Sequence, residues 1–237
     1  MTWIEDEFLC DPVLIGSKVV HGFGVRGSQV PESTAFPRQV HGVEVVKASA
    51  WQPGEAPSAD VILSGPRASC VGIVTADCVP ILVAAVDGSR VAAIHAGWRG
   101  LAAGVVEAGL AAFRAASGGL DWMAAVGPAA RGCCYEVDEP VRQALAERYA
   151  SELDSPVLEP GRDGHFMLDL PLLATHLLER LGANSTRIGT KHRVCTVCSP
   201  GRFESYRRDG AAAGRLRHFI AARGPFAERV DSPGGHP

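Results

Sequence analysis

The sequence predicts an α/β (α+β) fold in which mixed β-sheets are layered with helices on their outer faces. Short runs rich in Val, Ile and Ala alternate along the chain with segments whose apolar residues recur at helical spacing. The chain has 237 residues, 46% of them hydrophobic, which is enough for one substantial core. Because no linker-like stretch or long repeat divides the sequence, we expect a single domain over residues 1–237, with a frayed tail from about residue 228.

Seven segments are predicted as strands because they are short, rich in β-branched or small apolar residues and bounded by Gly, Pro, Asp or Ser. In chain order they are VEVVKA (43–48), DVILS (60–64), SCVGIVTA (69–76), VPILVAAV (79–86), RVAAIHA (90–96), WMAAVGP (122–128) and GRLRHFIAAR (214–223).

Three segments are predicted as helices. After the strand that ends near His95, the chain runs on as one apolar-patterned helix through GVVEAGLAAFRAA (104–116). DEPVRQALAERYA (138–150) starts with Asp138 as an N-cap and has a proline in its first turn. LDLPLLATHLLERLG (168–182) is helical after its proline and closed by Gly182.

Composition excludes several classes of protein. The net charge is −3 and there is no run of five Lys or Arg residues, so we expect no nucleic-acid partner. The longest apolar run, near VPILVAAV, is too short to cross a membrane. The first ten residues, MTWIEDEFLC, are acidic and lack an apolar stretch of signal-peptide length, which predicts a cytoplasmic protein.

The seven cysteines are expected to be thiols, because a chain without a secretion signal does not usually build a disulfide framework. Cys195 and Cys198 form a C-x-x-C motif, which could bind metal or act in redox chemistry. The second C-x-x-C pair of a zinc ribbon is absent, so this motif alone is weak evidence. Cys133 and Cys134 are expected to pack in a tight turn.

Three short stretches place a soft ligand at a predicted strand edge or end. PRQVHGVEV carries His41, IVTADCVPI carries Asp77 and Cys78, and AIHAGWRG carries His95. Strand ends are where open α/β folds gather their sites. Two histidines and one cysteine form a sensible zinc set that leaves a position for water, whose pKa would fall towards about 7.

The same residues also fit two other hypotheses. Cys78 could be a nucleophile with His95 as its base and Asp77 orienting the ring. Alternatively, a fourth ligand such as Cys134 would close the site and make the protein a zinc-stabilised binding module. Residue identity does not separate these hypotheses, but metal content and turnover do.

A second group of residues is suited to anions. Gly97 and Gly100 bracket Trp98 and Arg99 at the start of a predicted helix, where backbone N–H groups favour negative charge. Arg99 adds a fork of donors for phosphate or carboxylate. The cluster FESYRRDG (203–210) contains Arg207, which could also contact an anion. The alternative is that this cluster is a solvent-exposed turn.

Five blocks of sequence, taken together, resemble a known family. RQVHG (38–42), TADCVPIL (75–82), HAGWRGLAAGVVE (95–107), GPAARGCCYEV (127–137) and FESYRRDG (203–210) are similar to the YfiH-type family. That family is also called the multicopper polyphenol oxidoreductase, or laccase-like, family and the purine nucleoside phosphorylase family. The resemblance implies a YfiH/CNF1-like α/β fold and a zinc held by His41, Cys78 and His95.

The resemblance also implies an enzyme acting on purine nucleosides. Its reactions would be phosphorolysis of adenosine, inosine, guanosine and methylthioadenosine, and deamination of adenosine. We expect Arg38, Gln39, Trp98, Arg99 and Arg207 to contact the nucleoside and phosphate. Asp77 would act with Cys78 and His95 in catalysis, as the proton shuttle. The oligomeric state is left open between monomer and homodimer.

Copper-dependent phenol oxidation is the alternative activity. The chain has eight histidines and no His-x-His pair, whereas a multicopper cluster needs many histidines, often paired in that way. Copper could still bind the three-residue set, because it outcompetes zinc at many nitrogen and sulfur sites.

Overall fold

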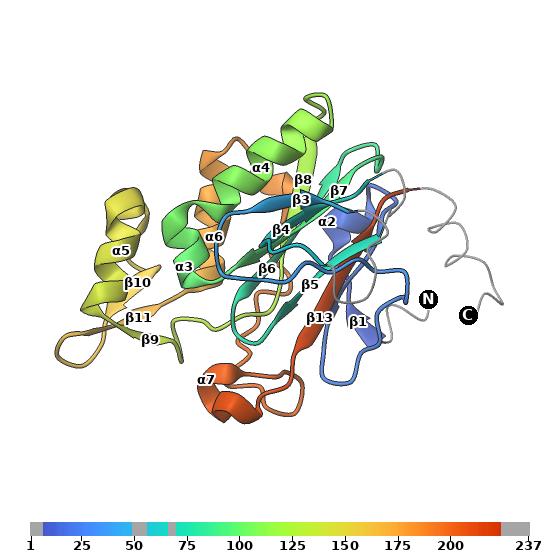
Figure 1. The fold of residues 1–237 in the computed structure, drawn as a ribbon. Coiled ribbons are helices and arrows are strands. Elements are labelled where there is room, and N and C mark those ends of the chain that lie inside the picture. Colours follow the sequence, from blue (N-terminus) through green and yellow to red (C-terminus); the bar gives the residue numbers. More distant parts are fainter. Residues whose placement is uncertain (1–6, 49–55, 66–69, 224–237) are drawn as a thin grey trace.

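The central element of the fold is a six-stranded mixed sheet (Figure 1). The structure is a computed structural model, and it describes residues 7–48, 56–65 and 70–223. Its strand order is β12 (Ile188–Gly189), β8 (Trp122–Val126), β6 (Val79–Ala85), β7 (Val91–Ala96), β4 (Val61–Leu63) and β3 (Val45–Lys47). The two outermost pairs are parallel and the inner pairs are antiparallel. This arrangement confirms the predicted mixed α/β class.

The two faces of this sheet belong to two different cores. Side chains alternate across a strand, so Val61 and Ile81 enter one apolar cluster while Ile62 and Leu82 enter the other. Every residue of β6 is buried. The sheet is therefore covered on both sides, which explains why VPILVAAV is a continuous apolar run and not an alternating one.

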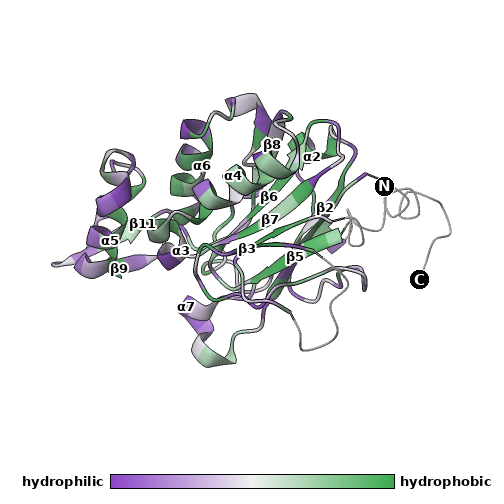
Figure 2. Ribbon diagram, turned by 45° about the horizontal axis from the view of Figure 1, so that its top comes forward, coloured by the Kyte–Doolittle hydropathy of each residue, from purple (hydrophilic) through white to green (hydrophobic). Residues whose placement is uncertain are grey.

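Helices cover one face of the central sheet. α4 (Val105–Ala116) and α6 (Leu170–Arg180) contact each other and the central strands, and their buried residues join the larger cluster. Figure 2 shows hydrophobic residues along the central strands and hydrophilic residues on the outer helices and loops. Asp169 caps α6 by accepting from the Leu172 N–H at 3.0 Å, and Gly182 follows the helix with a positive φ of 96°.

A second sheet covers the other face. Its order is β1 (Phe8–Leu9), β2 (Val20–Gly24), β13 (Leu216–Ala221) and β5 (Cys70–Thr75), and all its pairs are antiparallel. β13 lies between strands from the first third of the chain, with Phe219 opposite Gly22 on one side and Gly72 on the other. Residues far apart in sequence therefore close this layer.

A third, small sheet projects from the body of the molecule (Figure 1). It contains β10 (Leu158–Pro160), β11 (His165–Leu168) and β9 (Glu136–Asp138), and α5 (Glu139–Tyr149) follows β9 directly. The predicted N-cap of α5 is confirmed, because Asp138 accepts from the Val141 N–H at 3.4 Å. Tyr149 is fully buried at the end of this helix.

The prediction of a single helix after His95 is wrong, because the structure has two helices there. α3 (Trp98–Ala103) ends at Gly104, whose φ is 92°, and α4 starts at the next residue. Only glycine adopts this left-handed conformation readily, so the chain turns there. The predicted tail beyond residue 228 lies outside the described residues.

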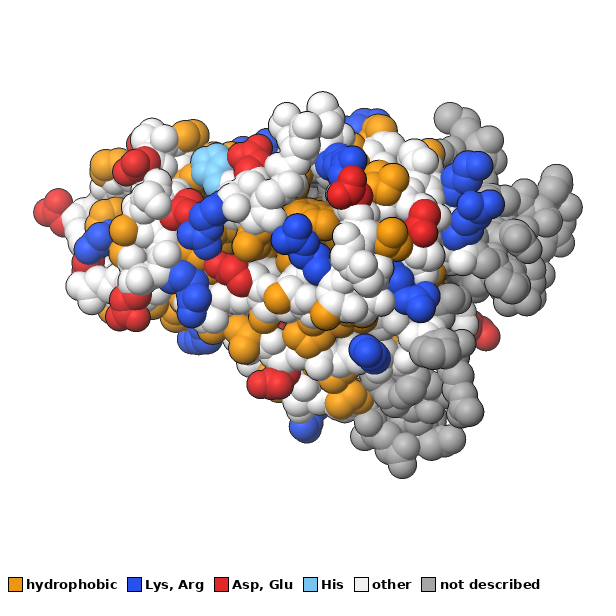
Figure 3. Space-filling view, turned by 90° about the horizontal axis from the view of Figure 1, so that it is seen from above, with side chains coloured by type: hydrophobic (Ala, Val, Ile, Leu, Met, Phe, Trp, Pro, Cys, Tyr) orange, Lys and Arg blue, Asp and Glu red, His pale blue; other side chains and the backbone are white. Residues whose placement is uncertain are grey.

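The remaining elements are short. They are α2 (Pro12–Ile15), α7 (Tyr206–Asp209) and the 3₁₀ helices η1 (Ala150–Glu152), η2 (Ser185–Arg187) and η3 (Gly210–Ala212). Within the described ranges, no helix has both the length and the apolar character needed to cross a membrane. On the face in Figure 3, basic and acidic side chains are interspersed, and no broad stripe of one charge is visible.

Candidate functional site

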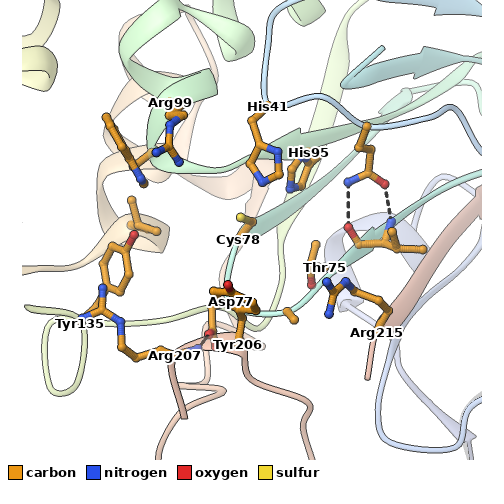
Figure 4. A pocket seen from close by; sticks show the side chains of 15 residues that line it. His41, Thr75, Asp77, Cys78, His95, Arg99, Tyr135, Tyr206, Arg207 and Arg215 are labelled. Atoms are coloured by element: carbon orange, nitrogen blue, oxygen red, sulfur yellow. Dashed lines mark hydrogen bonds between the residues drawn. The ribbon is translucent and has the colours of Figure 1, made fainter. Parts of the chain in front are cut away.

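Three residues predicted as metal ligands come together at one end of the central sheet. His41 lies in the loop before β3, Cys78 in the turn between β5 and β6, and His95 on β7. Their ligand atoms all lie within 4.8 Å of one another. Pairing of β6 with β7 sets Pro80 opposite His95, which brings Cys78 beside that histidine. In Figure 4 both imidazole rings point toward the Cys78 sulfur.

The backbone at this site adopts conformations that side-chain-bearing residues rarely adopt. His41 has a φ of 60° and Asp77 a φ of 87°. Left-handed conformations cost free energy at non-glycine residues and concentrate at functional sites. Gly97 provides space for the cluster, because a Cβ there would lie 2.9 Å from Cys78 Sγ and 3.2 Å from His41 Cδ2.

Asp60 is the buried acceptor that holds two of these ligands in place. Its Oδ1 is 2.7 Å from His95 Nδ1 and also accepts from the His41 backbone N–H at 2.9 Å. Its Oδ2 accepts from the Gly42 N–H at 2.7 Å and from the Val40 N–H at 3.2 Å. With Nδ1 directed at the carboxylate, His95 Nε2 is left for a ligand, as in carboxylate–histidine–metal arrangements.

The cluster favours a thiolate at Cys78. Burial raises the pKa of this thiol, but interactions with His41 and His95 outweigh burial and lower the pKa to about 6. Burial lowers the pKa of His95, whereas Asp60 and Cys78 raise it to about 9. Cysteine binds metals as the thiolate, so these neighbours prepare Cys78 as a soft ligand.

A cavity of about 630 Å³ opens beside the cluster. Its lining includes His41, Asp77, Cys78 and His95, three arginines (Arg99, Arg207 and Arg215) and three aromatic residues (Trp98, Tyr135 and Tyr206). The cavity has the size of a small-molecule site. Among the described residues, no carboxylate forms an ion pair with any of these three arginines.

Two of the arginines lie over aromatic rings. The Arg99 guanidinium carbon is 4.4 Å from the Trp98 ring centre, and that of Arg207 is 4.6 Å from the Tyr135 ring centre. Arg207 also donates to the Glu136 carbonyl at 2.7 Å. These contacts orient the two side chains without neutralising their charge.

Asp77 lines the cavity, and both of its carboxylate oxygens accept hydrogen bonds. Oδ1 accepts from the Thr196 hydroxyl at 2.6 Å. Oδ2 accepts from the Ser205 hydroxyl at 3.0 Å and from the Arg207 backbone N–H at 2.6 Å. The side chain is buried, so this geometry favours a role in positioning the start of α7, and with it Arg207.

The other two predicted substrate contacts differ from each other. Gln39 lines the cavity, but its amide forms two hydrogen bonds with the Val74 backbone, both 2.7 Å long, and so ties the His41 loop to β5 (Figure 4). Arg38 does not line the cavity. Its guanidinium donates instead to the Ser58 hydroxyl at 2.6 and 3.1 Å.

Sequence reasoning missed three residues that matter here: Tyr135, Arg215 and Asp60. Tyr135 and Arg215 reach the cavity from the GCCYEV turn and from the residue before β13, whereas Tyr206, which belongs to the FESYRRDG cluster singled out in the sequence, reaches it from α7. Asp60 was noted only as the boundary of a predicted strand. A buried aspartate beside an apolar run was the available signal, since such a carboxylate needs donors.

Fold and site together define a mixed α/β protein with a His/Cys metal-type cluster in an arginine-lined cavity. The family described as multi-copper polyphenol oxidoreductase laccase matches residues 24–223. The chain therefore belongs to this laccase-like family, which includes the YfiH proteins.

Relatives in this family carry enzyme names. A Xylella fastidiosa protein named purine nucleoside phosphorylase is 39% identical over 185 residues, covering 76% of this chain and 69% of its own. Purine nucleoside phosphorylase YfiH of Escherichia coli is 33% identical over 191 residues, covering 81% and 74%.

Solved structures show the same fold. YlmD of Geobacillus stearothermophilus superposes with a TM-score of 0.77 at 25% identity, covering 90% of this chain and 94% of its own. A Neisseria meningitidis protein superposes with a TM-score of 0.68 at 34% identity, covering 81% and 75%.

Proposed function

We propose that this protein is a zinc-dependent enzyme that acts on purine nucleosides, with phosphorolysis as its main reaction. The observation that carries the proposal is one cavity that combines the His41, Cys78 and His95 cluster with three arginines that have no carboxylate partner among the described residues. The relatives named purine nucleoside phosphorylase supply the substrate class.

The donor set fits zinc. Two imidazoles and one thiolate are zinc ligands, and three protein ligands leave a position open, as in catalytic sites. His41, Cys78 and His95 would hold the ion, and Asp60 would keep His95 oriented. When bound there, zinc would supply a Lewis acid. The same donors also suit copper, so the native metal is part of the proposal.

The arginines are the proposed phosphate site. One guanidinium group can donate two parallel hydrogen bonds to two oxygens of a phosphate. Arg99, Arg207 and Arg215 all line the same cavity. Asp77 accepts from the Arg207 backbone N–H, while the Trp98 and Tyr135 rings stack against the Arg99 and Arg207 guanidinium groups. Phosphate bound here would be held ready to attack a nucleoside in the same cavity.

In phosphorolysis a phosphate oxygen forms a bond to the anomeric carbon of the ribose. The bond from that carbon to the base nitrogen breaks, and the base leaves with the bonding electrons and takes up a proton. Burial is the main cause that raises the pKa of Tyr135 to about 12, so its phenol stays protonated at neutral pH and can donate a hydrogen bond. Tyr206, an exposed aromatic residue of the lining, offers an apolar face for the base, whereas the Trp98 and Tyr135 rings already carry guanidinium groups.

Deamination of adenosine is proposed as a second activity of the same site. The open donor set supports it, because an activated water could attack the ring carbon that bears the amine. The role of Asp77 as the proton shuttle stays a prediction. Its hydrogen bonds to Thr196, Ser205 and Arg207 involve both carboxylate oxygens, which argues against that role.

Two rival activities have less support. Multicopper oxidation needs more histidine ligands than the described residues gather, because only His41 and His95 join a metal-type group there. A cysteine hydrolase using Cys78 and His95 fits the lowered pKa of Cys78, but it would work without metal.

The test is to incubate the purified protein with adenosine and phosphate and to identify the products by chromatography and mass. Adenine with ribose 1-phosphate supports phosphorolysis, and inosine supports deamination. Cys78→Ala should lose the zinc held by His41, Cys78 and His95, and with it turnover, while staying folded. Arg99→Ala should raise the KM for phosphate at least several-fold, whereas Arg114→Ala, an exposed arginine on α4, should not.

The proposal is overturned if no purine product forms with zinc bound, or if Cys78→Ala keeps full activity. Full activity in metal-free protein would favour the cysteine hydrolase instead.

A further inference from the structure

Four cysteines meet in a second cluster, outside the His41, Cys78 and His95 site. Cys133 and Cys134 lie in the turn after β8, and Cys195 and Cys198 belong to the C-x-x-C segment, about sixty residues further along the chain. Their sulfur atoms all lie within 4.8 Å of one another, and Cys133 Sγ is 3.7 Å from Cys198 Sγ. The adjacent pair supplies the second half that the C-x-x-C lacked in the sequence.

The Cys133–Cys198 separation matches that expected around a single tetrahedral ion. Zinc binds thiolates at about 2.3 Å, so two sulfurs at neighbouring corners of its tetrahedron lie roughly 3.8 Å apart. The cysteines of a cubane iron–sulfur cluster each bind a different iron and are therefore spread more widely than this group. A disulfide needs its sulfurs at about 2.0 Å, well inside the observed separation.

The surroundings of the cluster favour a thiolate at one of its four cysteines, Cys195. Burial raises the pKa of Cys133 and Cys134, and the neighbouring thiols raise the pKa of Cys133 further. Burial opposes ionisation of Cys195 too, but hydrogen bonds from the Cys198 and Arg131 backbones lower its pKa. Backbone N–H groups directed at a sulfur favour a thiolate, and a bound metal would let all four ionise together.

We propose that Cys133, Cys134, Cys195 and Cys198 form a second metal site that holds one structural zinc ion as a tetrathiolate. All four positions of the tetrahedron are filled by the protein, so no position is left for water or substrate. The site is thus distinct in chemistry from the open three-residue cluster.

The ion would hold together two segments that adjoin the cavity lining. Residues 128–135 and 194–198 already contact each other through backbone hydrogen bonds, from the Ala129 N–H to the Val194 carbonyl and from the Thr196 N–H to the Ala129 carbonyl, both 3.1 Å long. Tyr135, in the cavity lining, directly follows Cys134. Thr196, which donates to Asp77, directly follows Cys195.

The experiment counts metal in the full-length protein. After reduction, reconstitution with zinc and removal of free metal, elemental analysis should find two zinc ions per wild-type chain. Cys195→Ser/Cys198→Ser and Cys78→Ala should each retain one, and the triple variant none. Cys70→Ser is the matched control, since Cys70 is a buried cysteine outside both clusters, and it should retain two.

A second measurement avoids dependence on the folding of the double variant. Cobalt added to metal-free Cys78→Ala should give the intense sulfur-to-metal absorption of a tetrathiolate site. One zinc per wild-type chain with none in Cys78→Ala would overturn the proposal. So would disulfides joining these four cysteines in reduced and reconstituted protein. Either result would leave the nucleoside activity of the other site to be judged by its own assay.

Discussion

Asp60 is the residue through which three parts of the candidate metal site are connected. One carboxylate accepts from the His95 ring and from the backbone of His41 and Gly42. It therefore fixes the orientation of one proposed ligand and the left-handed loop that carries another. A carboxylate with no exposed surface could not remain charged without such donors.

Replacing Asp60 with Asn should weaken zinc binding by about 10- to 100-fold, because the neutral amide supports the His95 ring less well. Zinc affinity is measured by competition with a chelating dye. Asp87→Asn, at an exposed turn, is the control and should bind zinc as the wild type does. Equal affinity in Asp60→Asn would contradict the positioning role.

For single residues, the sequence indicates which side chains have suitable chemistry better than it indicates which groups they contact. His41, Cys78 and His95 stand out because their chemistry is rare and each lies at a strand edge, and the structure brings them together. Their role as ligands stays a prediction. Arg38 has the right chemistry for phosphate but bonds Ser58 instead. That contact depends on a bridge between distant segments, which no local pattern reveals.

At the scale of elements, the turn at Gly104 sets where the chain after His95 can pack. α3 contacts α5, whereas α4 packs on the central sheet beside β7. One straight helix could not make both sets of contacts. The left-handed glycine therefore directs Trp98 and Arg99 toward the cavity while α4 covers the core.

Gly104→Ala should lower the free energy of unfolding by about 1–2 kcal/mol, because an L-residue is strained at a φ of 92°. Urea denaturation measures the change. Gly16→Ala is the control, since Gly16 has an ordinary helical φ of −59° and a Cβ there would make only normal contacts. A neutral Gly104→Ala would show that the two helices can join without strain.

The long elements could be predicted, and so could the short strands β3 and β4, but several other short elements could not. β5, β6, β7 and β8 are continuous apolar runs, α4 has helical spacing, and α5 and α6 also carry cap residues, so local pattern suffices. Strands such as β1, β9 and β12 have only two or three residues. Their pairing depends on distant segments, which leaves almost no trace in local sequence.

At the scale of the whole molecule, two buried histidines couple stability to pH. His218 Nδ1 accepts from the Gly24 N–H at 3.1 Å, and His21 Nε2 accepts from the Asp11 N–H at 2.8 Å. Each ring is thus neutral in the folded protein. Burial is the main cause that lowers the pKa of His218 to about 3 and that of His21 to about 4.

The unfolded chain takes up protons at these histidines near pH 6.5, whereas the folded chain does not until far lower pH. The free energy of unfolding should therefore fall as pH falls below about 6.5, by up to about 1.4 kcal/mol per unit for each histidine. Urea denaturation at pH 7 and pH 5 measures this slope. His218→Gln should flatten it, while His165→Gln, near the surface, should not; equal slopes in all three proteins would contradict the prediction.

The organisation as a single domain, the cytoplasmic location and the oligomeric state stay predictions, since none of them is tested by the described residues. The predicted class of fold is confirmed by the solved relatives.

The position of β13 has a consequence for how the protein is made in the cell. This strand, residues 216–221, completes a sheet whose other members all lie before residue 76. Chains emerge from the ribosome starting at the N-terminus. The edges of β2 and β5 that pair with β13 therefore stay unpaired until almost all of the described chain has been translated. Arg207 and Arg215 emerge in the same late interval, so the complete cavity is among the last parts of the protein to form.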